Sequence, residues 1–182
     1  TLIQPASETT IIDKNYIIYK AIREGLTYSF RKDGKDDFTT VKLIDFDNPS
    51  NNTFTAVNQM WIRGQYNWRR PDVLVFINGM PLVFIELKNG NIPVRQAYTK
   101  NLKSYLTDVP NLFTMNQICI LSNGLETRLG AFNAGYEFFF EWLKNSEEDV
   151  IDRESIKDNA LSIQYMADSL LNKETLIDYI EN

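Results

Sequence analysis

The sequence contains no histidine among its 182 residues. This absence excludes Ser-His-Asp and Cys-His catalysis, histidine general bases and zinc sites built on imidazole. A metal ion bound by this chain must therefore be held by oxygen ligands, which favours Mg²⁺, with Mn²⁺ as the second choice.

Cysteine is nearly absent, and long apolar runs are missing. The single thiol, Cys119, lies in the apolar run 118–121, so we expect a buried free cysteine, which suits the reducing cytoplasm of a prokaryotic cell. There is no run of 18 apolar residues and no visible N-terminal signal segment, so we expect no membrane association. The first residue is Thr1 and not Met, from which we expect a piece of a longer protein.

The chain also lacks a basic excess, because 19 lysines and arginines stand against 24 acidic residues, a net charge of −5. DNA-binding domains are usually basic. If this chain acts on DNA, either a local basic patch or other domains must hold the nucleic acid. The apolar share of 43% is nevertheless that of a globular domain with a real core.

The most informative segment is 70–88, in which two apolar runs are joined by a turn. Such runs predict buried strands. Charges stand only at the outer ends, with Asp72 at the start and Glu86 and Lys88 at the finish. Charged groups placed beside a core must be paired or bound to a metal. The alternative is that the three charges simply mark strand ends that emerge into solvent.

The geometry of this hairpin distinguishes the two interpretations. Glu86 and Lys88 are two apart on a strand and so share a face. A plain two-residue Asn78-Gly79 turn would pair Asp72 with Ile85 and point Glu86 away from Asp72. A three-residue loop, or a β-bulge, would restore the shared face. The functional interpretation therefore predicts an odd loop or a bulge, and the other one predicts a simple turn.

The remaining pattern predicts an α/β fold with a mixed central β-sheet flanked by α-helices. Asp13 or Ser7 is expected to cap the first helix. The expected elements, in chain order, are a helix at 11–26, strands at 38–46 and 53–62, the hairpin at 71–88, a helix at 94–106, strands at 116–121 and 125–132, an aromatic stretch at 136–142 and polar helical sequence from 152 onward.

The chemistry of the hairpin charges fits phosphodiester hydrolysis. Asp72 and Glu86 can hold one or two Mg²⁺ ions, and the backbone carbonyl of Leu87 is a plausible further ligand. A metal so placed polarises a phosphate and lowers the pKa of a bound water. Lys88 can position the attacking water or stabilise charge that develops on the phosphate.

These residues resemble a known pattern. Pro71-Asp72 followed after thirteen residues by Glu86-Leu87-Lys88 is similar to the motif of the PD-(D/E)xK nuclease superfamily. The surroundings, from about residue 16 to residue 142, resemble the N-terminal endonuclease domain of the restriction subunit of type I restriction-modification enzymes. The segments that carry this resemblance are 41–49, 52–59, 70–72, 78–82, 85–89, 109–113 and 121–128.

The resemblance implies further site residues. The family carries a glutamine four residues before a tyrosine on the helix that follows the lysine strand. Tyr105 is in place here, but the earlier position is Asn101, which keeps the amide with one methylene fewer. Both are implied to support the site or the DNA. Many relatives also use a glutamate of the first helix near the metal, for which Glu24 is the best match.

The segment 61–70 leads directly into Asp72 and mixes aromatic residues with three arginines. Arginine suits phosphate contacts, and aromatic rings suit base stacking. We expect Arg69 and Arg70 to contact DNA, and we expect the tryptophans of this segment to lie in the core.

No phosphate-binding loop of the Gly-x-x-x-x-Gly-Lys-Ser/Thr type is present. The resemblance therefore implies an endonuclease domain at 1–150 and a helical extension at 151–182 that leads towards, or packs against, an ATP-driven motor lying elsewhere. ATP would act only through that motor. The implied partners are double-stranded DNA and the methyltransferase and specificity subunits. The alternatives are a stand-alone repair nuclease or Holliday-junction resolvase, and a docking module with a dead site.

Overall fold

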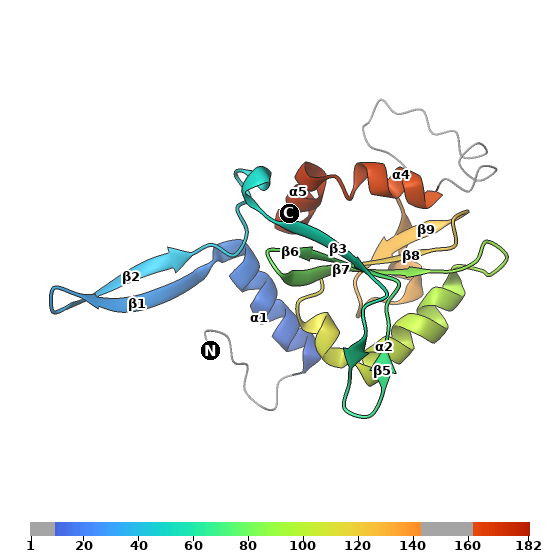
Figure 1. Cartoon of the computed structure of the whole chain (residues 1–182), viewed down its shortest axis with the longest axis horizontal. Coiled ribbons are helices and arrows are strands. Elements are labelled where there is room, and N and C mark those ends of the chain that lie inside the picture. The colour runs from blue at the N-terminus through green and yellow to red at the C-terminus, as the bar shows by residue number, and fades with distance from the viewer. Residues whose placement is uncertain (1–9, 143–161) are drawn as a thin grey trace.

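A computed structural model describes residues 10–142 and 162–182, and its centre is a six-stranded mixed sheet (Figure 1). The strand order is β10-β9-β8-β7-β6-β3. β7 and β8 run parallel, and the other neighbouring pairs are antiparallel. The strands are β3 (Phe54–Asn58), β6 (Val73–Ile77), β7 (Met80–Leu87), β8 (Ile118–Ser122), β9 (Thr127–Gly130) and β10 (Phe140–Glu141).

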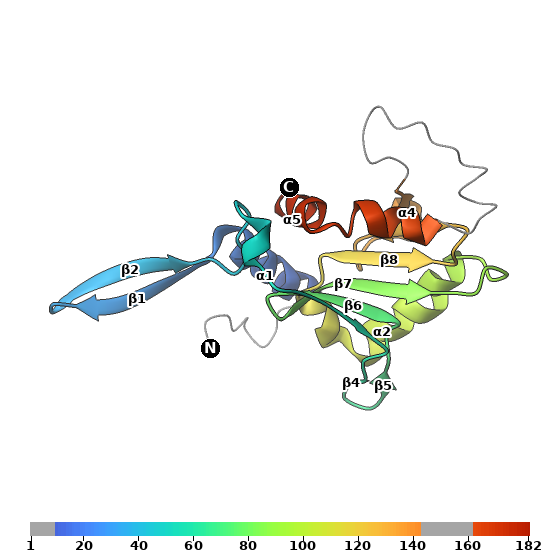
Figure 2. The same cartoon turned by 45° about the horizontal axis from the view of Figure 1, so that its top comes forward.

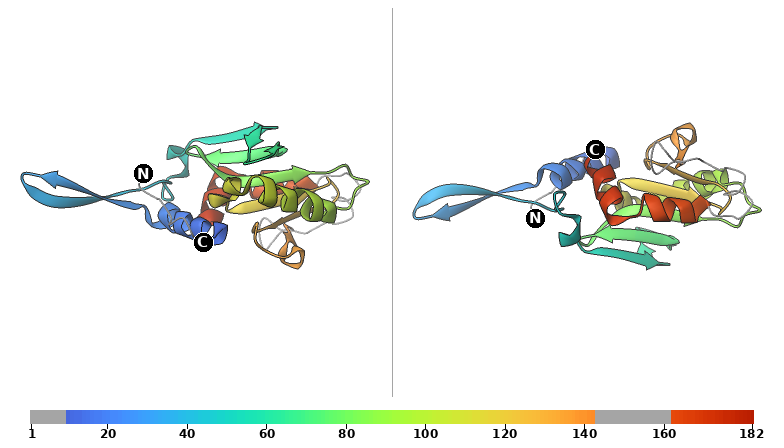
Figure 3. Two further views of the ribbon diagram at one scale, coloured as in Figure 1. Left: turned by 90° about the horizontal axis from the view of Figure 1, so that it is seen from below. Right: turned by 90° about the horizontal axis from the view of Figure 1, so that it is seen from above.

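Helices cover both faces of this sheet, so the predicted α/β architecture is confirmed. One core cluster joins the sheet to α1 (Ile11–Glu24), α4 (Ser162–Ser169) and α5 (Lys173–Glu181). A second cluster lies under a helical segment in which a π-helix, η2 (Ala97–Leu102), continues into α2 (Lys103–Asp108). Figure 3 shows α4 and α5 on the opposite side of the sheet from α2.

The first helix illustrates how local sequence sets an element's ends. Thr10 is the N-cap, and its side chain and that of Asp13 bond reciprocally to each other's backbone N–H in a capping box. Gly25 ends the helix with a φ of 83°, a conformation that glycine adopts without strain. Asp13 thus takes part in the cap, while the alternative Ser7 lies outside the described residues.

A two-stranded arm projects from the body beyond the end of α1 (Figures 1 and 2). It consists of β1 (Leu26–Lys32) and β2 (Lys35–Val41), and every residue of β2 is exposed. The strand expected at 38–46 therefore lies earlier in the chain, and β1 was not predicted. A strand without a buried face lacks the regular alternation of apolar and polar residues by which strands are predicted, which explains why β1 was not predicted.

The segment expected as one strand at 53–62 divides in two. β3 (Phe54–Asn58) joins the main sheet, whereas β4 (Ile62–Arg63) pairs with β5 (Trp68–Arg69) in a separate small hairpin. Within the described residues there are also three short 3-10 helices: η1 (Pro49–Asn51), η3 (Pro110–Thr114) and η4 (Tyr136–Phe138). The last falls in the aromatic stretch at 136–142, whose structure the sequence left open.

The C-terminal helices pack onto the sheet. Met166 and Leu170 of the α4 region and Leu176 of α5 share one core cluster with sheet residues. The boundary expected at 150/151 lies outside the described residues, as does the start of the polar helical sequence. Cys119 is a buried free thiol, as predicted. Within 10–142 and 162–182, no helix has the length and apolarity needed to cross a bilayer.

Candidate active site

The β6–β7 hairpin contains the bulge that the functional interpretation required. Its turn is the two-residue Asn78-Gly79, both with positive φ, the conformation of a tight hairpin turn. Val75 pairs with Val83, but Phe76 pairs with Pro81, which leaves one extra residue, Leu82, on β7. Because of that residue, Val73 opposes Ile85, and Asp72 comes opposite Glu86.

The alternation of side chains then places both carboxylates on one face of the sheet. Leu74 of β6 and Phe84 of β7 belong to the core cluster beneath η2 and α2. Asp72 lies two residues before Leu74, just ahead of β6, and Glu86 lies two residues after Phe84 in β7, so both point to the same side as these core residues. The two acidic residues therefore meet at the end of the hairpin, facing the helical segment at 95–108.

Glu86 is the buried centre of this group, with only 3% of its surface exposed. Its Oε1 atom accepts hydrogen bonds from Nζ of Lys88 at 2.7 Å and from Nδ2 of Asn101 at 2.5 Å. Its Oε2 atom is the single buried side-chain oxygen or nitrogen of the described residues that has no hydrogen-bond partner. A buried, unpartnered carboxylate oxygen costs free energy unless a cation meets it.

Asp72 is fixed by two hydrogen bonds. Its Oδ2 atom accepts from the backbone N–H of Leu87 at 2.7 Å, which ties it to the neighbouring strand. Its Oδ1 atom accepts from Nε2 of Gln59 at 2.7 Å, and the backbone N–H of Gln59 also donates to the carbonyl of Asp72. Gln59 was not assigned a role from the sequence, because an isolated glutamine after a strand carries no local signal.

The electrostatics of the group favour an added cation. Burial raises the pKa of Glu86 above its ordinary range; the hydrogen bond from Lys88 opposes this shift, and the charge of Asp72 adds to it. The ammonium of Lys88, which also donates to the carbonyl of Leu87 at 3.1 Å, thus offsets part of the cost of a buried carboxylate.

The helix opposite the carboxylates supplies Asn101 and Tyr105. Asn101 lies in the π-helical turn, where the spacing differs from the regular α-helix that we expected. Tyr105 packs edge-on against Phe84, with ring centroids 5.1 Å apart. Burial raises the pKa of its phenol, and the charges of Glu86 and Asp72 add to the shift. Tyr105 is therefore both a core aromatic and a neighbour of the carboxylates.

The arginines of the segment 61–70 differ in their surroundings. Arg69 forms an ion pair with Asp108 at the end of α2, whereas the guanidinium of Arg70 lies over the ring of Trp61. The prediction that the tryptophans here are core residues is wrong, because Trp61 and Trp68 are 60% and 56% exposed. Trp61 and Trp68 belong to neither core cluster, whereas Ile62 of the same hairpin packs against the cluster beneath α2.

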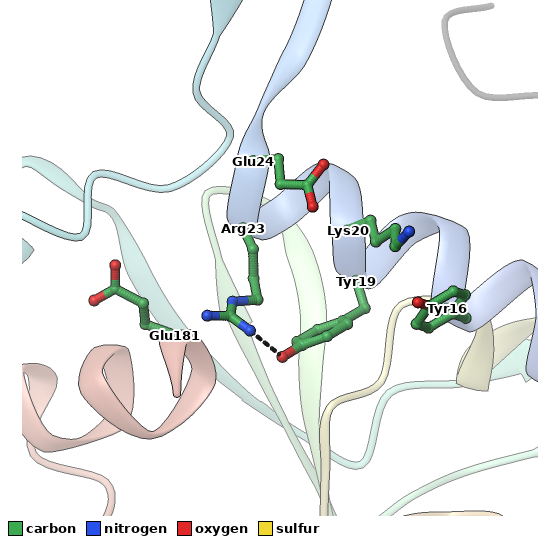
Figure 4. A pocket seen from close by; sticks show the side chains of 6 residues that line it. All are labelled: Tyr16, Tyr19, Lys20, Arg23, Glu24 and Glu181. Carbon is green, nitrogen blue, oxygen red and sulfur yellow. Dashed lines mark hydrogen bonds between the residues drawn. The ribbon is translucent and has the colours of Figure 1, made fainter.

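Glu24 is not part of this group, which corrects the expectation that it could be a metal ligand. It lies in the last turn of α1, next to the projecting arm, and lines a different pocket with Tyr19, Arg23 and Glu181 (Figure 4). β7 carries Glu86 at its far end from this arm (Figure 1). The helix axis therefore directs Glu24 away from the sheet edge where Asp72 and Glu86 meet.

The residues at the hairpin's end fit a divalent ion that prefers oxygen. Two carboxylates and the carbonyl of Leu87 supply only oxygen donors, as Mg²⁺ requires. The buried Oε2 of Glu86 is a ligand atom without a partner. No group of three or more acidic or cysteine residues gathers anywhere in the described parts of the chain, so the candidate centre consists of two acids and a backbone oxygen.

One known family matches most of this chain. The family model described as "Type I restriction enzyme R protein N terminus (HSDR_N)" matches residues 2–138. The chain belongs to this family. The R-protein N terminus matched here includes the bulged hairpin, both carboxylates, the lysine and the helical segment that faces them. Membership also weighs against the alternative of a stand-alone repair nuclease or resolvase.

Individual relatives extend the match to the whole chain. The type I restriction enzyme HindI endonuclease subunit of Haemophilus influenzae is 33% identical over 99% of this chain and 17% of its own length. The putative MjaIXP endonuclease subunit of Methanocaldococcus jannaschii is 31% identical over 91% of this chain and, again, 17% of its own. The chain thus corresponds to about a sixth of these two subunits.

Proposed function

We propose that this R-protein N-terminal domain hydrolyses DNA phosphodiester bonds with the help of Mg²⁺. The observation that carries the proposal is the pairing of Asp72 with a buried Glu86 whose Oε2 atom has no partner. Family membership adds weight, because the relatives are named as endonuclease subunits. The tight Asn78-Gly79 turn does not require the bulge at Leu82, but the bulge brings the two carboxylates to the same face. This supports a catalytic role.

Asp72, Glu86 and the carbonyl of Leu87 would hold the ion, with Mn²⁺ as a substitute. When bound, Mg²⁺ supplies Lewis acidity towards a phosphate oxygen and makes a water more acidic. The hydrogen bonds from Leu87 and Gln59 hold Asp72 in place before any ion arrives. This preorganisation reduces the loss of side-chain freedom on binding.

Lys88 is the proposed cationic group at the reacting phosphate. Its side chain is 18% exposed, so the ammonium can leave Glu86 and turn towards a substrate at the surface. There it would stabilise negative charge on the phosphate or orient the attacking water. Asn101 and Tyr105 act as positioning residues, since both contact or neighbour Glu86 from the opposite helix.

The wider setting follows from the relatives. We propose that the domain works inside a type I complex with methyltransferase and specificity subunits, in the cytoplasm of a prokaryote. ATP hydrolysis would belong to motor domains outside these 182 residues. Double-stranded DNA is the proposed substrate, with Arg70 next to the site and Arg69 held by Asp108.

The test uses the intact restriction complex that carries this domain. Asp72→Asn and Lys88→Ala should abolish DNA cleavage while ATP hydrolysis continues at the unmodified rate. Glu24→Gln is the matched control, because that carboxylate lies in a different pocket, and it should leave cleavage unchanged. Cleavage that survives both site substitutions would overturn the proposal and favour a docking module with a dead site.

A further inference from the structure

The small hairpin β4–β5 is attached to the end of α2 through its connecting loop and through β5. Both carboxylate oxygens of Asp108, at the end of α2, accept from the hairpin: Oδ1 from Asn67 and Oδ2 from Arg69. The backbone of Gly64 lies so close that a Cβ atom there would be 1.8 Å from the carbonyl oxygen of Asp108. Only glycine permits this approach. The hairpin is therefore a fixed element and not a loose loop.

Three large aromatic side chains of this segment are exposed to solvent: one just before β4, one in the connecting loop and one in β5. Trp61, Tyr66 and Trp68 are 60%, 85% and 56% exposed. None of them belongs to either core cluster. Folding of the described chain thus makes little use of these rings. Exposed aromatic residues that gather on one element mark an interaction surface.

Cations lie on the faces of two of these rings. The guanidinium of Arg63 is 5.8 Å from the ring centroid of Trp68, and that of Arg70 is 5.0 Å from that of Trp61. The stretch 59–71 contains three arginines and no acidic residue, in a chain whose net charge is −5. One of the three, Arg69, is paired with Asp108, so Arg63 and Arg70 carry the positive charge of this surface. This surface is therefore locally basic and aromatic within an acidic protein.

The hairpin also begins and ends at the candidate active site. Gln59, just before the hairpin, binds Asp72, just after it, through the side chain and the backbone. The hairpin leaves the body from this point and projects past the sheet on the α2 side (Figure 2). Because Gln59 and Asp72 flank the hairpin, a polyanion bound at Asp72 and Glu86 would lie beside the segment that carries these rings and arginines.

From these observations we infer that the β4–β5 hairpin grips the DNA strand beside the scissile phosphate. Trp61, Tyr66 and Trp68 stack on bases exposed where the duplex is locally opened, and Arg63 and Arg70 contact the flanking phosphates. A ring that carries a guanidinium on one face can accept a base on the other, and stacking on aromatic rings tolerates any sequence. The inference deepens the proposed function and rests on it for the identity of the ligand as DNA.

A protein partner is the competing occupant, because tryptophan, tyrosine and arginine also dominate protein interfaces. The continuity of the hairpin with Asp72 and its lack of acidic residues favour the polyanion. The two hydrogen bonds between Gln59 and Asp72 couple the hairpin to the proposed active site, and a surface for docking another protein does not need this coupling.

The test measures binding of a fluorescent single-stranded oligonucleotide and of the matching duplex by the 182-residue chain, in Ca²⁺ at low ionic strength. Unmodified protein should prefer the single strand. Trp61→Ala/Trp68→Ala should weaken its binding at least tenfold, since stacking contributes about 1–3 kcal/mol per base. Trp61→Phe/Trp68→Phe, which keeps the rings, should restore most of the affinity.

The matched control is Tyr28→Ala/Phe38→Ala, which removes two aromatic rings of the projecting arm that are 48% and 65% exposed. It should bind DNA as the unmodified chain does. Equal binding by the hairpin variant and this control, or no binding by the unmodified chain, would overturn the inference. So would a hairpin variant that keeps DNA affinity but fails to assemble with the other subunits.

The two sets of experiments distinguish a failure of this inference from a failure of the proposed function. If Lys88→Ala stops cleavage while the hairpin variant binds and cleaves normally, the function stands and the inference fails. If the hairpin variant loses DNA binding while Asp72→Asn still cleaves, the inference stands and the proposed active site fails.

Discussion

The buried carboxylate of Glu86 should link the stability of the domain to Mg²⁺. We choose Glu86→Gln as the perturbation because it changes charge with little change in shape. Lys88 and Asn101 both donate to Oε1, so the amide oxygen of the variant should take that position. The amide NH₂ then replaces Oε2, and a hydrogen-bond donor points to where the cation would bind.

The size of the effect follows from mass action. An ion present at 100 times its dissociation constant stabilises the folded state by about 2.7 kcal/mol. For a chain of 182 residues, each kcal/mol shifts the Tm by roughly 2–4 °C. Saturating Mg²⁺ should therefore raise the Tm of the unmodified domain by about 5–11 °C. The Glu86→Gln variant should show almost none of this rise.

Thermal unfolding followed by circular dichroism, with and without MgCl₂, measures both shifts. Glu24→Gln serves as the control, and its Tm should rise as much as that of the unmodified domain. An equal Mg²⁺-induced rise in the Glu86→Gln variant would refute the reasoning, as would a flat response of the unmodified domain at saturating Mg²⁺.

The same variant gives a pH test without metal. Burial raises the pKa of Glu86 in the folded state above its ordinary value of 4.5. The protonated side chain thus contributes stability that is complete below pH 4.5 and is lost as the pH rises through the raised pKa. The loss of the carboxylate does not leave the ammonium of Lys88 without an acceptor, because it also donates to the carbonyl of Leu87. Without Mg²⁺, Glu86→Gln should therefore unfold at a higher temperature than the unmodified domain at pH 7, and this advantage should vanish at pH 4.

Three further predictions concern the surroundings of the site. Asn101→Ala removes a hydrogen bond to a charged acceptor and should cost about 1.5–3 kcal/mol in urea unfolding, whereas an unchanged midpoint would show that this bond adds nothing. Phe84→Ala deletes a fully buried ring that contacts Tyr105 and should cost about 3–5 kcal/mol; a loss under about 1 kcal/mol would mean that the core closes around the gap. Hydrogen bonds from the β4–β5 hairpin hold the pKa of Asp108 below 3.8, so its anchoring effect is present above pH 3.8 and lost as the pH falls through the lowered pKa. Asp108→Asn should accordingly speed amide exchange in the hairpin at pH 7, and equal exchange in both proteins would contradict the anchoring role.

The hairpin at 71–88 shows how far sequence reasoning reaches. The sequence shows the two apolar runs, the Asn78-Gly79 turn and the terminal charges directly. Because side chains alternate between the two faces of a strand, Asp72 and Glu86 could share a face only if the hairpin had a bulge or a longer loop. The structure has the bulge at Leu82. Which residue would be extra was not predictable, because it depends on how both neighbouring strands and the helices pack.

The errors have a common physical source. The tryptophans at 61 and 68 were assigned to the core because apolar side chains are usually buried, but they occupy a hairpin that extends from the body. Glu24 was assigned to the metal because of its position on the first helix, but the direction of that helix takes it elsewhere. Helix direction and strand exposure are set by packing between distant segments, which a single sequence does not display.

The sequence by itself determined which ligands a metal site in this chain can use. Because histidine is absent, and two carboxylates and a lysine stand at the ends of apolar strands, such a site is restricted to oxygen ligands, which a hard cation prefers. Tertiary structure alone decided which groups meet: it placed Asn101 and Gln59 on the two carboxylates, separated Glu24 from them and left Oε2 of Glu86 buried without a partner. The reason is that residue types are local properties of a chain, whereas burial and contact arise from packing between segments far apart along it.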